Sequence, residues 1–142
     1  MSNTNSSSDA SLTARLNRVP RGQTATNIGP SRLGDMAEYW VCLLAAWKGA
    51  EVFKNQNSTG HIDLILVLAD GSMYPIDVKL ARPNGQGSWS GDTNKVKSPV
   101  IPVLVVPKGD DIAGWKVQWI HNRHPEHLAN FWDRSLTPFT HQ

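Results

Sequence analysis

The stretch that decides the fold covers residues 62–80 and reads IDLILVLADGSMYPIDVKL. It contains two strand patterns, residues 62–68 and residues 73–80, and the first is apolar on both faces from Leu64 onward. A run that is apolar on both faces is typical of a strand at the centre of a sheet. Ala69-Asp70-Gly71, which separates the two patterns, is typical of a hairpin turn. The stretch therefore predicts two antiparallel strands in the middle of a β-sheet.

The length of this hairpin loop determines whether its two aspartates meet. A two-residue Asp-Gly turn leaves Asp63 and Asp77 on opposite faces, because one step of register moves every side chain to the other face. A three-residue loop, residues 69–71 with Gly71 in the left-handed conformation, places Asp63 directly opposite Asp77. A glycine in the last position of the loop is what the three-residue form requires. The two carboxylates meet under this second option alone.

A helix is expected over residues 31–48, ahead of the strands. Ser31 is a suitable N-cap, Asp35 in the first turn favours the helix dipole, and Gly49 suits the C′ position. One wide apolar stripe at helical spacing contains Leu33, Met36, Ala37, Trp40, Leu43, Leu44 and Trp47. The opposite side is small or apolar except for Glu38, so we expect the helix to be covered on both sides. A carboxylate such as that of Glu38 is rarely buried without a partner.

The rest of the chain completes the fold class. Further strands are expected over residues 50–54, 100–106 and 116–120. Pro102 makes its strand an edge or starting strand, and residues 83–99 are expected to form a loop. Pro125 is expected to open a last helix that extends to about Leu136. This order predicts a mixed α+β domain of the α/β type. Among the tryptophans, core positions are expected for Trp40, Trp47 and Trp132, and strand or interface positions for Trp115 and Trp119.

The composition sets only broad limits. The 142 residues, 39 % of them hydrophobic, fit one domain, and no apolar run is long enough to span a bilayer. Residues 1–30 contain few aliphatic side chains, and their three arginines outnumber their one aspartate. We therefore expect a disordered basic arm, followed by a folded domain over residues 31–142. Cys42 is the only cysteine, and no leader pattern is present, so we expect a cytoplasmic protein. The net charge of +2 permits a polyanionic partner.

The acids and the lysine of the hairpin suggest a metal site. Asp77 and Lys79 are two residues apart on one strand and therefore share a face. Two carboxylates about 5 Å apart, as expected for Asp63 and Asp77, repel unless a cation lies between them. Mg²⁺ binds such carboxylates together with waters and a backbone carbonyl, here that of Val78, and Glu38 is placed to join directly or through water. Lys79 would then orient the nucleophile or neutralise charge during phosphodiester hydrolysis.

Each of these residues also has an ordinary explanation when taken alone. An Asp-x-Lys pattern is common on strands, Asp63 can be a strand-edge residue, and Glu38 can form a salt bridge with Lys79. Their order and their apolar neighbours favour one functional site over separate surface charges.

Several segments of this region resemble the PD-(D/E)xK nuclease superfamily. They are Gly34-Asp35-Met36-Ala37-Glu38, Gly49, Asn55-Gln56-Asn57-Ser58, Gly60-His61-Ile62-Asp63-Leu64 and Pro75-Ile76-Asp77-Val78-Lys79. The resemblance covers residues 31–82 and is closest to archaeal Holliday junction resolvases and to small enzymes of group I introns and phages. It implies a restriction-endonuclease-like central mixed sheet flanked by helices, Mg²⁺ as cofactor with Mn²⁺ as a substitute, DNA as substrate, and a homodimer or higher homo-oligomer.

The resemblance also implies roles for particular residues. Glu38 matches the helix acid, Asp63 the motif aspartate, and Asp77 with Lys79 the (D/E)xK pair. The helix that usually follows the third strand would fall within residues 83–99, where a loop is expected. Candidate DNA-binding residues are Arg32, Lys54, Ser58, Arg82, Trp89, Lys95 and Lys97. Solvated surface charge is the ordinary alternative for the basic residues, and packing onto the core is the alternative for the tryptophan.

Three hypotheses about function follow. The first is an Mg²⁺-dependent DNA endonuclease, a hydrolase that cuts branched, Holliday junction-like DNA or duplex DNA, as in DNA recombination, and that acts in the host cytoplasm if a phage encodes it. The second is a catalytically silent DNA-binding or assembly module on the same fold. The third is an RNA or nucleotide phosphodiesterase with similar metal chemistry. Binding of Mg²⁺ at Asp63 and Asp77 separates the first from the second.

Overall fold

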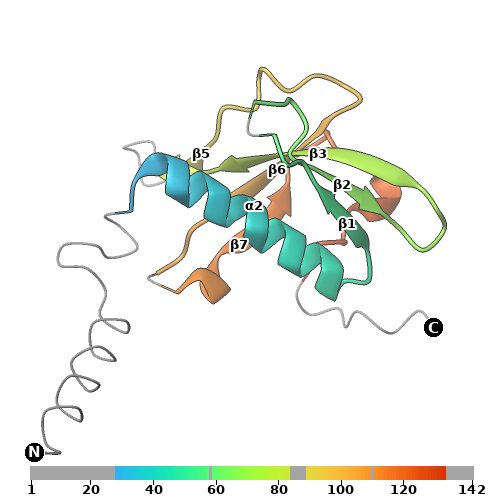
Figure 1. Cartoon of the computed structure of the whole chain (residues 1–142), viewed down its shortest axis with the longest axis horizontal. Helices are drawn as coiled ribbons and strands as arrows, with labels where there is room; N and C mark the ends of the chain where they lie inside the picture. Colours follow the sequence, from blue (N-terminus) through green and yellow to red (C-terminus); the bar gives the residue numbers. More distant parts are fainter. Residues whose placement is uncertain (1–27, 58, 84–88, 110, 134–142) are drawn as a thin grey trace, which may run out of the picture.

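The computed structural model describes residues 28–57, 59–83, 89–109 and 111–133. It contains a five-stranded mixed sheet with the strand order β1-β2-β3-β6-β7, and Figure 1 shows an α-helix, α2, lying across one face of this sheet. The bounds are Pro30–Trp47 for α2, Glu51–Lys54 for β1, Leu64–Val67 for β2, Met73–Leu80 for β3, Ile101–Val106 for β6 and Lys116–Trp119 for β7. The predicted mixed α+β class is confirmed.

The hairpin between β2 and β3 has the three-residue loop. The Leu68 N–H donates to the Ser72 carbonyl at 2.9 Å, and the Gly71 N–H donates to the Leu68 carbonyl at 2.9 Å. Gly71 has a φ of +85°, in the left-handed region that glycine adopts at little cost. The strands pair with Leu64 opposite Ile76, so the residues one step before and after, Asp63 and Asp77, stand opposite each other. The register that brings the two acids together is therefore present.

Substituting Gly71 tests this loop. We expect Gly71→Ala to lower the free energy of unfolding by about 1 kcal/mol, because a Cβ is strained at positive φ. Gly34→Ala is a matched control, because Gly34 lies inside α2 with nothing within 4 Å of an added Cβ. That variant is expected to be more stable by about 0.5–1 kcal/mol. Urea denaturation followed by circular dichroism measures both, and equal signs for the two variants would contradict the assigned loop.

The core lies between α2 and one face of the sheet. Because side chains alternate along a strand, Leu64, Leu66 and Ile76 share the helix-facing side, and all three are fully buried. Asp77 and Lys79 consequently lie on the other face of β3. The buried core cluster contains Ala37, Trp40, Val41, Leu44, Ala45, Ala50, Leu64, Leu66, Ile76, Val103, Val105, Trp115, Val117, Trp119, Leu128 and Trp132.

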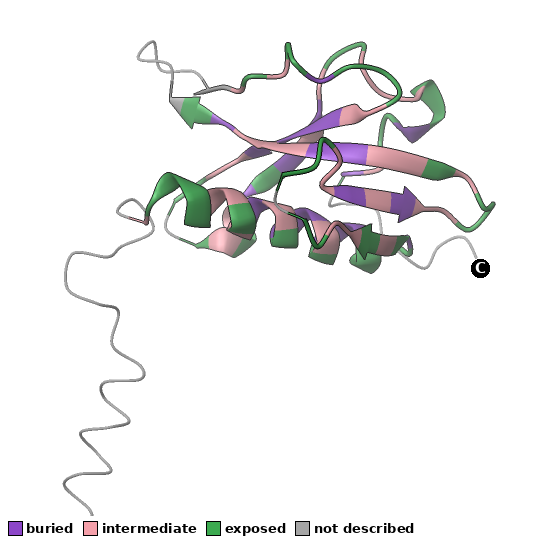
Figure 2. Cartoon of the chain, turned by 45° about the horizontal axis from the view of Figure 1, so that its top comes forward, coloured by how far each residue is buried: buried purple, intermediate pink, exposed green. Residues whose placement is uncertain are grey.

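The expectation of a helix covered on both sides is wrong. The buried stripe of α2 consists of Ala37, Trp40, Val41, Leu44 and Ala45. Figure 2 shows exposed residues along the outer side of this helix, where Leu43 is 60 % exposed and Trp47 is 62 % exposed. The sheet covers one stripe of the helix, so the outer members of the predicted wide stripe remain in contact with solvent.

The ends of α2 confirm one prediction and correct two. At the C-terminal end, Gly49 has a φ of +92°, its N–H donates to Ala46, and the next N–H reaches back to Ala45, which is the Schellman arrangement. At the N-terminal end, the helix begins at Pro30, not after Ser31, because proline suits the first helical position. Asp35 therefore lies in the second turn of the helix, too far from the N-terminus to interact with the helix dipole as predicted.

Two further predictions about elements are corrected. Strand β6 was predicted as an edge strand but lies inside the sheet, between β3 and β7. It pairs with β3 from Ile101 onward but with β7 only from Val103 onward. Pro102, which has no N–H, therefore precedes the pairing with β7 and leaves no gap in it. The predicted loop, residues 83–99, includes part of a small two-stranded ladder formed by β4 (Arg82–Pro83) and β5 (Trp89–Ser90). Two short 3₁₀ helices also occur, at Ile112–Gly114 and Glu126–Leu128.

The second of these 3₁₀ helices stands where the last α-helix was predicted to begin. Within the described residues, this region forms one short helix and turns. It is attached to β7 by a hydrogen bond in which the Trp119 Nε1–H donates to the Leu128 carbonyl at 2.7 Å. The rest of the predicted helix, residues 134–136, lies outside the described residues, as does the predicted arm up to residue 27. No described helix is both long and apolar enough to cross a membrane.

Candidate functional site

The residues proposed from sequence as catalytic line one pocket of about 350 Å³ at the end of β2. Glu38 comes from α2, Asp63 from the residue just before β2, and Asp77 with Lys79 from β3. The complete lining is Gly34, Asp35, Glu38, Lys54, Asn55, Gln56, Asn57, Gly60, Asp63, Asp77, Val78 and Lys79. The fold thus gathers residues that are up to 41 positions apart in the sequence, from Glu38 to Lys79.

Asp63 is fixed by the backbone on both sides. Its N–H donates to the Ile76 carbonyl at 2.9 Å and its carbonyl accepts the Asn55 N–H at 2.8 Å. Its carboxylate Oδ2 accepts the Val78 N–H at 2.6 Å. Because the N–H and C=O of one strand residue point to the same edge, the Val78 carbonyl points toward the side of β3 on which Asp63 lies. A carboxylate and a carbonyl oxygen are therefore directed to the same end of the strand pair.

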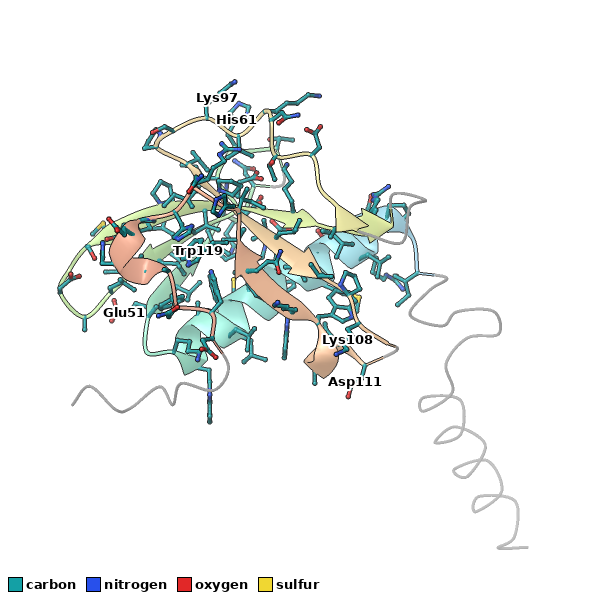
Figure 3. All side chains as sticks on the ribbon, turned by 180° about the vertical axis from the view of Figure 1, so that it is seen from behind. Glu51, His61, Lys97, Lys108, Asp111 and Trp119 are labelled. Carbon is teal, nitrogen blue, oxygen red and sulfur yellow. The ribbon has the colours of Figure 1, made fainter. Side chains whose placement is uncertain are left out.

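Asp77 is the buried acid of the pocket and is 8 % exposed. Its Oδ2 forms an ion pair with the Lys79 Nζ at 3.1 Å and has no other polar partner among the residues that the structure describes. Burial raises the pKa of Asp77, and the neighbouring Lys79 opposes this shift. The charge of Asp63 also raises this pKa, and that of His61, which lies at the top of Figure 3, lowers it.

Glu38 is the acid of the site whose pKa is most strongly shifted. Burial, followed by a hydrogen bond to Asp63 and the charge of Asp63, raises the pKa of Glu38 to about 7, and Lys54 opposes this shift. In a carboxyl–carboxylate hydrogen bond one partner carries the proton, and the raised pKa assigns that proton to Glu38. The pocket lining contains four acids, Asp35, Glu38, Asp63 and Asp77, and two lysines, Lys54 and Lys79, so its acids outnumber its lysines by two.

The three acids do not form a single cluster. No group of three or more His, Cys, Asp or Glu side chains within the described ranges is arranged to hold a metal ion. The reason lies in the sheet: Glu38 approaches from the helix side, Asp77 projects from the other face of β3, and Asp63 lies between them at the end of β2. Asp63 acts on both other acids: it is hydrogen-bonded to Glu38, and its charge raises the pKa of Asp77.

The shifted acid predicts how stability depends on pH in metal-free buffer. The pKa of Glu38 is about 7 in the folded protein and near 4.5 in the unfolded chain. The protonated Glu38 therefore favours folding most below pH 4.5, and this contribution to stability is lost as the pH rises through 7. Glu38→Gln should therefore unfold at higher denaturant concentration than the wild type at pH 8. Since Glu38 is only partly buried, solvent screening limits the gain to about 1 kcal/mol.

Asp70 gives the control with the opposite sign. Hydrogen bonds from Ser72 lower the pKa of Asp70, so removing that charge with Asp70→Asn should not stabilise the protein at pH 8. Urea titrations of the wild type and both variants at about pH 4.5 and pH 8 measure the difference. Equal stability of Glu38→Gln and the wild type at pH 8 would contradict the shifted carboxyl group.

The candidate DNA-binding residues are only partly gathered at this pocket. Lys54 lines it, with its Nζ 4.9 Å from the centroid of the Tyr39 ring. Four others are exposed and lie outside the lining: Arg32, Arg82, Lys95 and Lys97. Ser58 and the side chain of Trp89 lie outside the described part of the chain, although the Trp89 backbone pairs with Pro83 in β4.

Asn55 is a site residue whose role was not predicted. Its Nδ2 donates to the Ile62 carbonyl at 2.8 Å and its Oδ1 accepts the Asn57 N–H at 2.8 Å. These bonds close the loop that forms one wall of the pocket and lead the chain into Asp63. The Asn-x-Asn spacing is a signal for such an Asx turn and could have identified it.

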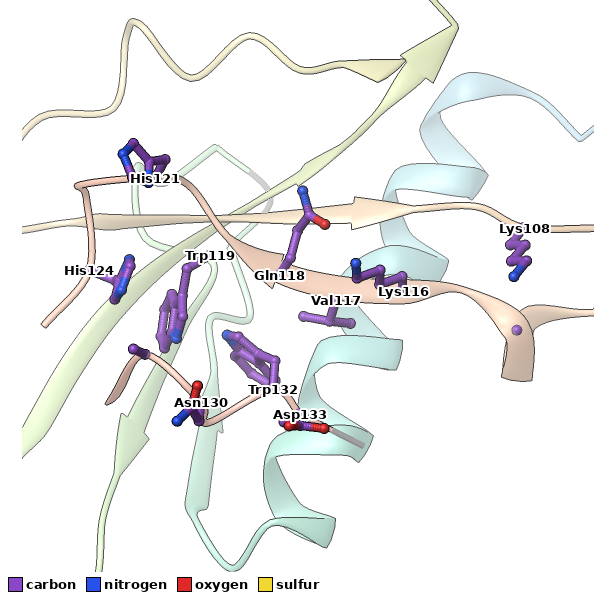
Figure 4. Close-up of a pocket in the computed structure, with 12 residues that line it drawn as sticks. Lys108, Lys116, Val117, Gln118, Trp119, His121, His124, Asn130, Trp132 and Asp133 are labelled. Atoms are coloured by element: carbon purple, nitrogen blue, oxygen red, sulfur yellow. The ribbon is translucent and has the colours of Figure 1, made fainter. Parts of the chain in front are cut away.

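A larger hollow, of about 750 Å³, lies along the edge strand β7 and contains none of the predicted site residues. Figure 4 shows Trp119 and Trp132 close together beside β7, with Lys116 on the strand. Its lining combines two lysines, Lys108 and Lys116, with a single acid, Asp133. Without a pair of acids it offers no site for the metal chemistry considered above.

The fold and the site together define a mixed α+β protein with an acid–lysine pocket at the end of its central strands. No protein-family model matches the chain, and no curated protein matches it. Among solved structures, the bacterial homing endonuclease I-Ssp6803I is similar, with a TM-score of 0.47 and 17 % identity over 64 % of this chain. The chain covers 65 % of that endonuclease, which is less than two thirds of its length. This likeness assigns no residue a role, so the resemblance to PD-(D/E)xK nucleases stays a prediction.

Proposed function

We propose that this protein is an Mg²⁺-dependent DNA endonuclease that hydrolyses phosphodiester bonds in branched or duplex DNA. The observation that carries the proposal is the register of β2 against β3, which sets Asp63 opposite Asp77 with Lys79 in the same pocket. Two opposed acids, a carbonyl and a lysine at one strand end are the groups that metal-assisted attack of water on a phosphate requires. Cleavage of a four-way junction would need two such sites related by a two-fold axis, so we expect a homodimer or higher homo-oligomer on that substrate.

The donor set of the pocket fits a hard divalent cation. Asp77 has a buried carboxylate oxygen whose one polar partner among the described residues is Lys79, and Asp63 supplies a second carboxylate. Mg²⁺ needs only one or two carboxylates because it keeps several waters, so a cluster of three acids is not required. Asp63, Asp77 and the Val78 carbonyl would hold the ion. When bound, it would lower the pKa of a coordinated water and supply positive charge beside the phosphate.

The other residues of the pocket have roles that follow from their contacts. Lys79, whose side chain is 35 % exposed, can reach a phosphate in the pocket while it remains paired with Asp77, and it would neutralise the charge that develops during cleavage. Glu38 and the Val78 N–H both bind the Asp63 carboxylate and would hold it in one orientation. Lys54, on the same wall, would bind the DNA backbone.

The test compares substrates in parallel. Purified full-length protein is incubated with a four-way junction, a linear duplex, single-stranded DNA and RNA, each with Mg²⁺, with Mn²⁺ and with a chelator. We expect metal-dependent cuts in the junction or the duplex and none with the chelator. Cuts in RNA alone would replace the proposal with an RNA phosphodiesterase, and no cut in any substrate would overturn it.

The absence of a three-acid cluster in the described residues supports a second candidate, a catalytically silent DNA-binding module. The two candidates differ in metal binding. Mg²⁺ or Mn²⁺ should raise the melting temperature of the wild type, because a ligand that binds only the folded state stabilises it. The same ions should leave the melting temperature of Asp63→Asn unchanged if the proposed ligand set is correct. A silent module would show no such metal-dependent difference between the two proteins.

A further inference from the structure

Arg123 makes a contact that the proposed chemistry does not use. It follows β7, and its guanidinium donates to two backbone carbonyls on a distant segment, that of Thr93 at 2.7 Å and that of Val96. One planar guanidinium thus bridges two points of the same loop, a geometry that the fixed fork of arginine allows and that lysine cannot reproduce. The contact is partly buried, which makes it costly to leave either group unpaired.

The segment that Arg123 binds is residues 91–100, here called the lysine loop. Its own turns are closed by bonds from the Val96 N–H to Thr93 at 3.1 Å and from the Val100 N–H to Lys97 at 3.0 Å. Val96 is 7 % exposed and anchors the loop, whereas Lys95 and Lys97 are exposed. The anchored carbonyls flank Lys95 and immediately precede Lys97, so Arg123 binds the backbone from which both lysine side chains extend.

The lysine loop begins directly on the face of β3 that carries Asp77 and Lys79. A Cβ added at Gly91 would lie 2.6 Å from the Leu104 Cδ1 and 3.7 Å from the Lys79 Cβ, so the backbone passes closely over this face. In Figure 3, Lys97 lies at the top of the view together with His61, whose charge acts on Asp77. Lys97 therefore lies at the same end of this view as His61, and the loop that carries it begins close to Lys79.

We propose that Arg123 is a positioning residue that holds the lysine loop as a rigid phosphate-binding surface, so that Lys95 and Lys97 bind the DNA backbone beside the acid–lysine pocket. The inference rests on the proposed function, since it takes DNA as the ligand. A side chain pre-ordered for its contact loses less conformational freedom on binding, so the loop is expected to add affinity that a free loop would not. Arg123 itself touches neither the DNA nor the reacting atoms.

The experiment measures how DNA affinity depends on salt, with cleavage prevented by Asp77→Asn in every protein. The ligand is a labelled linear duplex, titrated at salt concentrations between about 50 and 200 mM. Each lysine–phosphate contact contributes about 0.9 to the slope of log affinity against log salt, so the double variant Lys95→Ala/Lys97→Ala should lower the slope by about 2. Arg123→Gln should lower it by nearly the same amount.

The combination of variants separates positioning from direct contact. If Arg123 acts through the loop, adding Arg123→Gln to the double lysine variant changes the slope no further, and Arg123→Lys fails to restore the wild-type slope although it keeps the charge. Additive slopes, or full restoration by Arg123→Lys, would overturn the inference. A general loss of structure would instead reduce the folded fraction seen by circular dichroism without changing the slope of the remaining folded protein.

Lys108→Ala/Lys116→Ala is the matched control, because these two lysines are also exposed but lie beside β7. It should change the slope by much less than the loop pair, and an equal decrease would overturn the assignment of the loop. The outcomes also separate this inference from the proposed function. DNA binding with the expected slopes but no cleavage of any substrate by the parent protein would overturn the nuclease and leave the positioning role intact. No DNA binding would overturn both.

Discussion

Replacing the buried acid of β3 by its amide, Asp77→Asn, should lower the rate of DNA cleavage by a factor of about 10³ or more, equal to about 4 kcal/mol of transition-state stabilisation. Asp77 stands opposite Asp63 in the hairpin register, and its buried carboxylate oxygen has Lys79 as its one polar partner among the described residues. An amide cannot supply the negative charge that a divalent cation requires. The effect should appear in the cleavage rate measured with saturating protein and Mg²⁺.

This loss can be separated from a loss of folding or of binding. Burial raises the pKa of Asp77, so a neutral side chain at this position is compatible with the fold, and we expect an unchanged or higher melting temperature in metal-free buffer. DNA affinity should be kept or increased, since a negative charge is removed from the binding surface. Cleavage at the wild-type rate by a correctly folded Asp77→Asn would exclude Asp77 from the chemistry.

Asp70→Asn is the matched control for the same chemical change. Asp70 is an exposed aspartate in the loop of the same hairpin, seven residues before Asp77, and its Oδ1 accepts the Ser72 N–H at 2.9 Å. Asparagine keeps that acceptor, so the turn should be preserved. Cleavage by Asp70→Asn is expected to stay within about twofold of the wild type, in keeping with the small effects of surface substitutions. Similar losses in both variants would show that the hairpin is merely sensitive to lost charge.

The features that could be predicted from sequence, such as turns and helix ends, are those that depend on neighbouring residues. The hairpin register follows from the position of Gly71 in its turn, and the end of the helix follows from Gly49, because a positive φ is a local property that glycine reveals. The meeting of Asp63 and Asp77 could therefore be predicted before the fold was known. The start of the helix was misplaced by two residues: Ser31 was predicted as the N-cap, whereas the N-cap is Gly29 and Pro30 takes the first helical position.

What could not be predicted depends on partners distant in the sequence. Glu38 was assigned to this site from sequence, but its direct hydrogen bond to Asp63 depends on how α2 lies against β2, which no spacing in either segment encodes. Arg123 was missed because it binds backbone carbonyls, which every residue has and which leave no compositional signal. The interior position of β6 was missed because the cost of Pro102 depends on where β7 begins to pair.

Whether a tryptophan is buried also depends on partners distant in the sequence. The substitution with the largest expected effect on stability is at one of these tryptophans. Trp119 lies on a strand, as expected, at the end of β7, and with 9 % exposure it also belongs to the core, while Trp47, expected in the core, is 62 % exposed. The Trp119 ring lies 5.8 Å from that of His124, in a stacked arrangement, and 5.4 Å from that of Trp132. With its hydrogen bond to the Leu128 carbonyl, it attaches the last described segment to β7.

Trp119→Ala should therefore lower the free energy of unfolding by about 3–5 kcal/mol, a large part of the stability of a domain of this size. Trp119→Phe keeps most of the buried ring but loses the bond to Leu128, and should cost about 1 kcal/mol for that bond in addition to the smaller ring. Trp47→Ala removes the same side chain from an exposed position on α2 and is expected to change stability by no more than about 0.5 kcal/mol. Urea denaturation followed by far-ultraviolet circular dichroism is the appropriate measurement, because fluorescence would itself change with each tryptophan. If Trp47→Ala destabilised the protein as much as Trp119→Ala, the outer face of α2 would have to be packed against something, and the single buried stripe described here would be wrong.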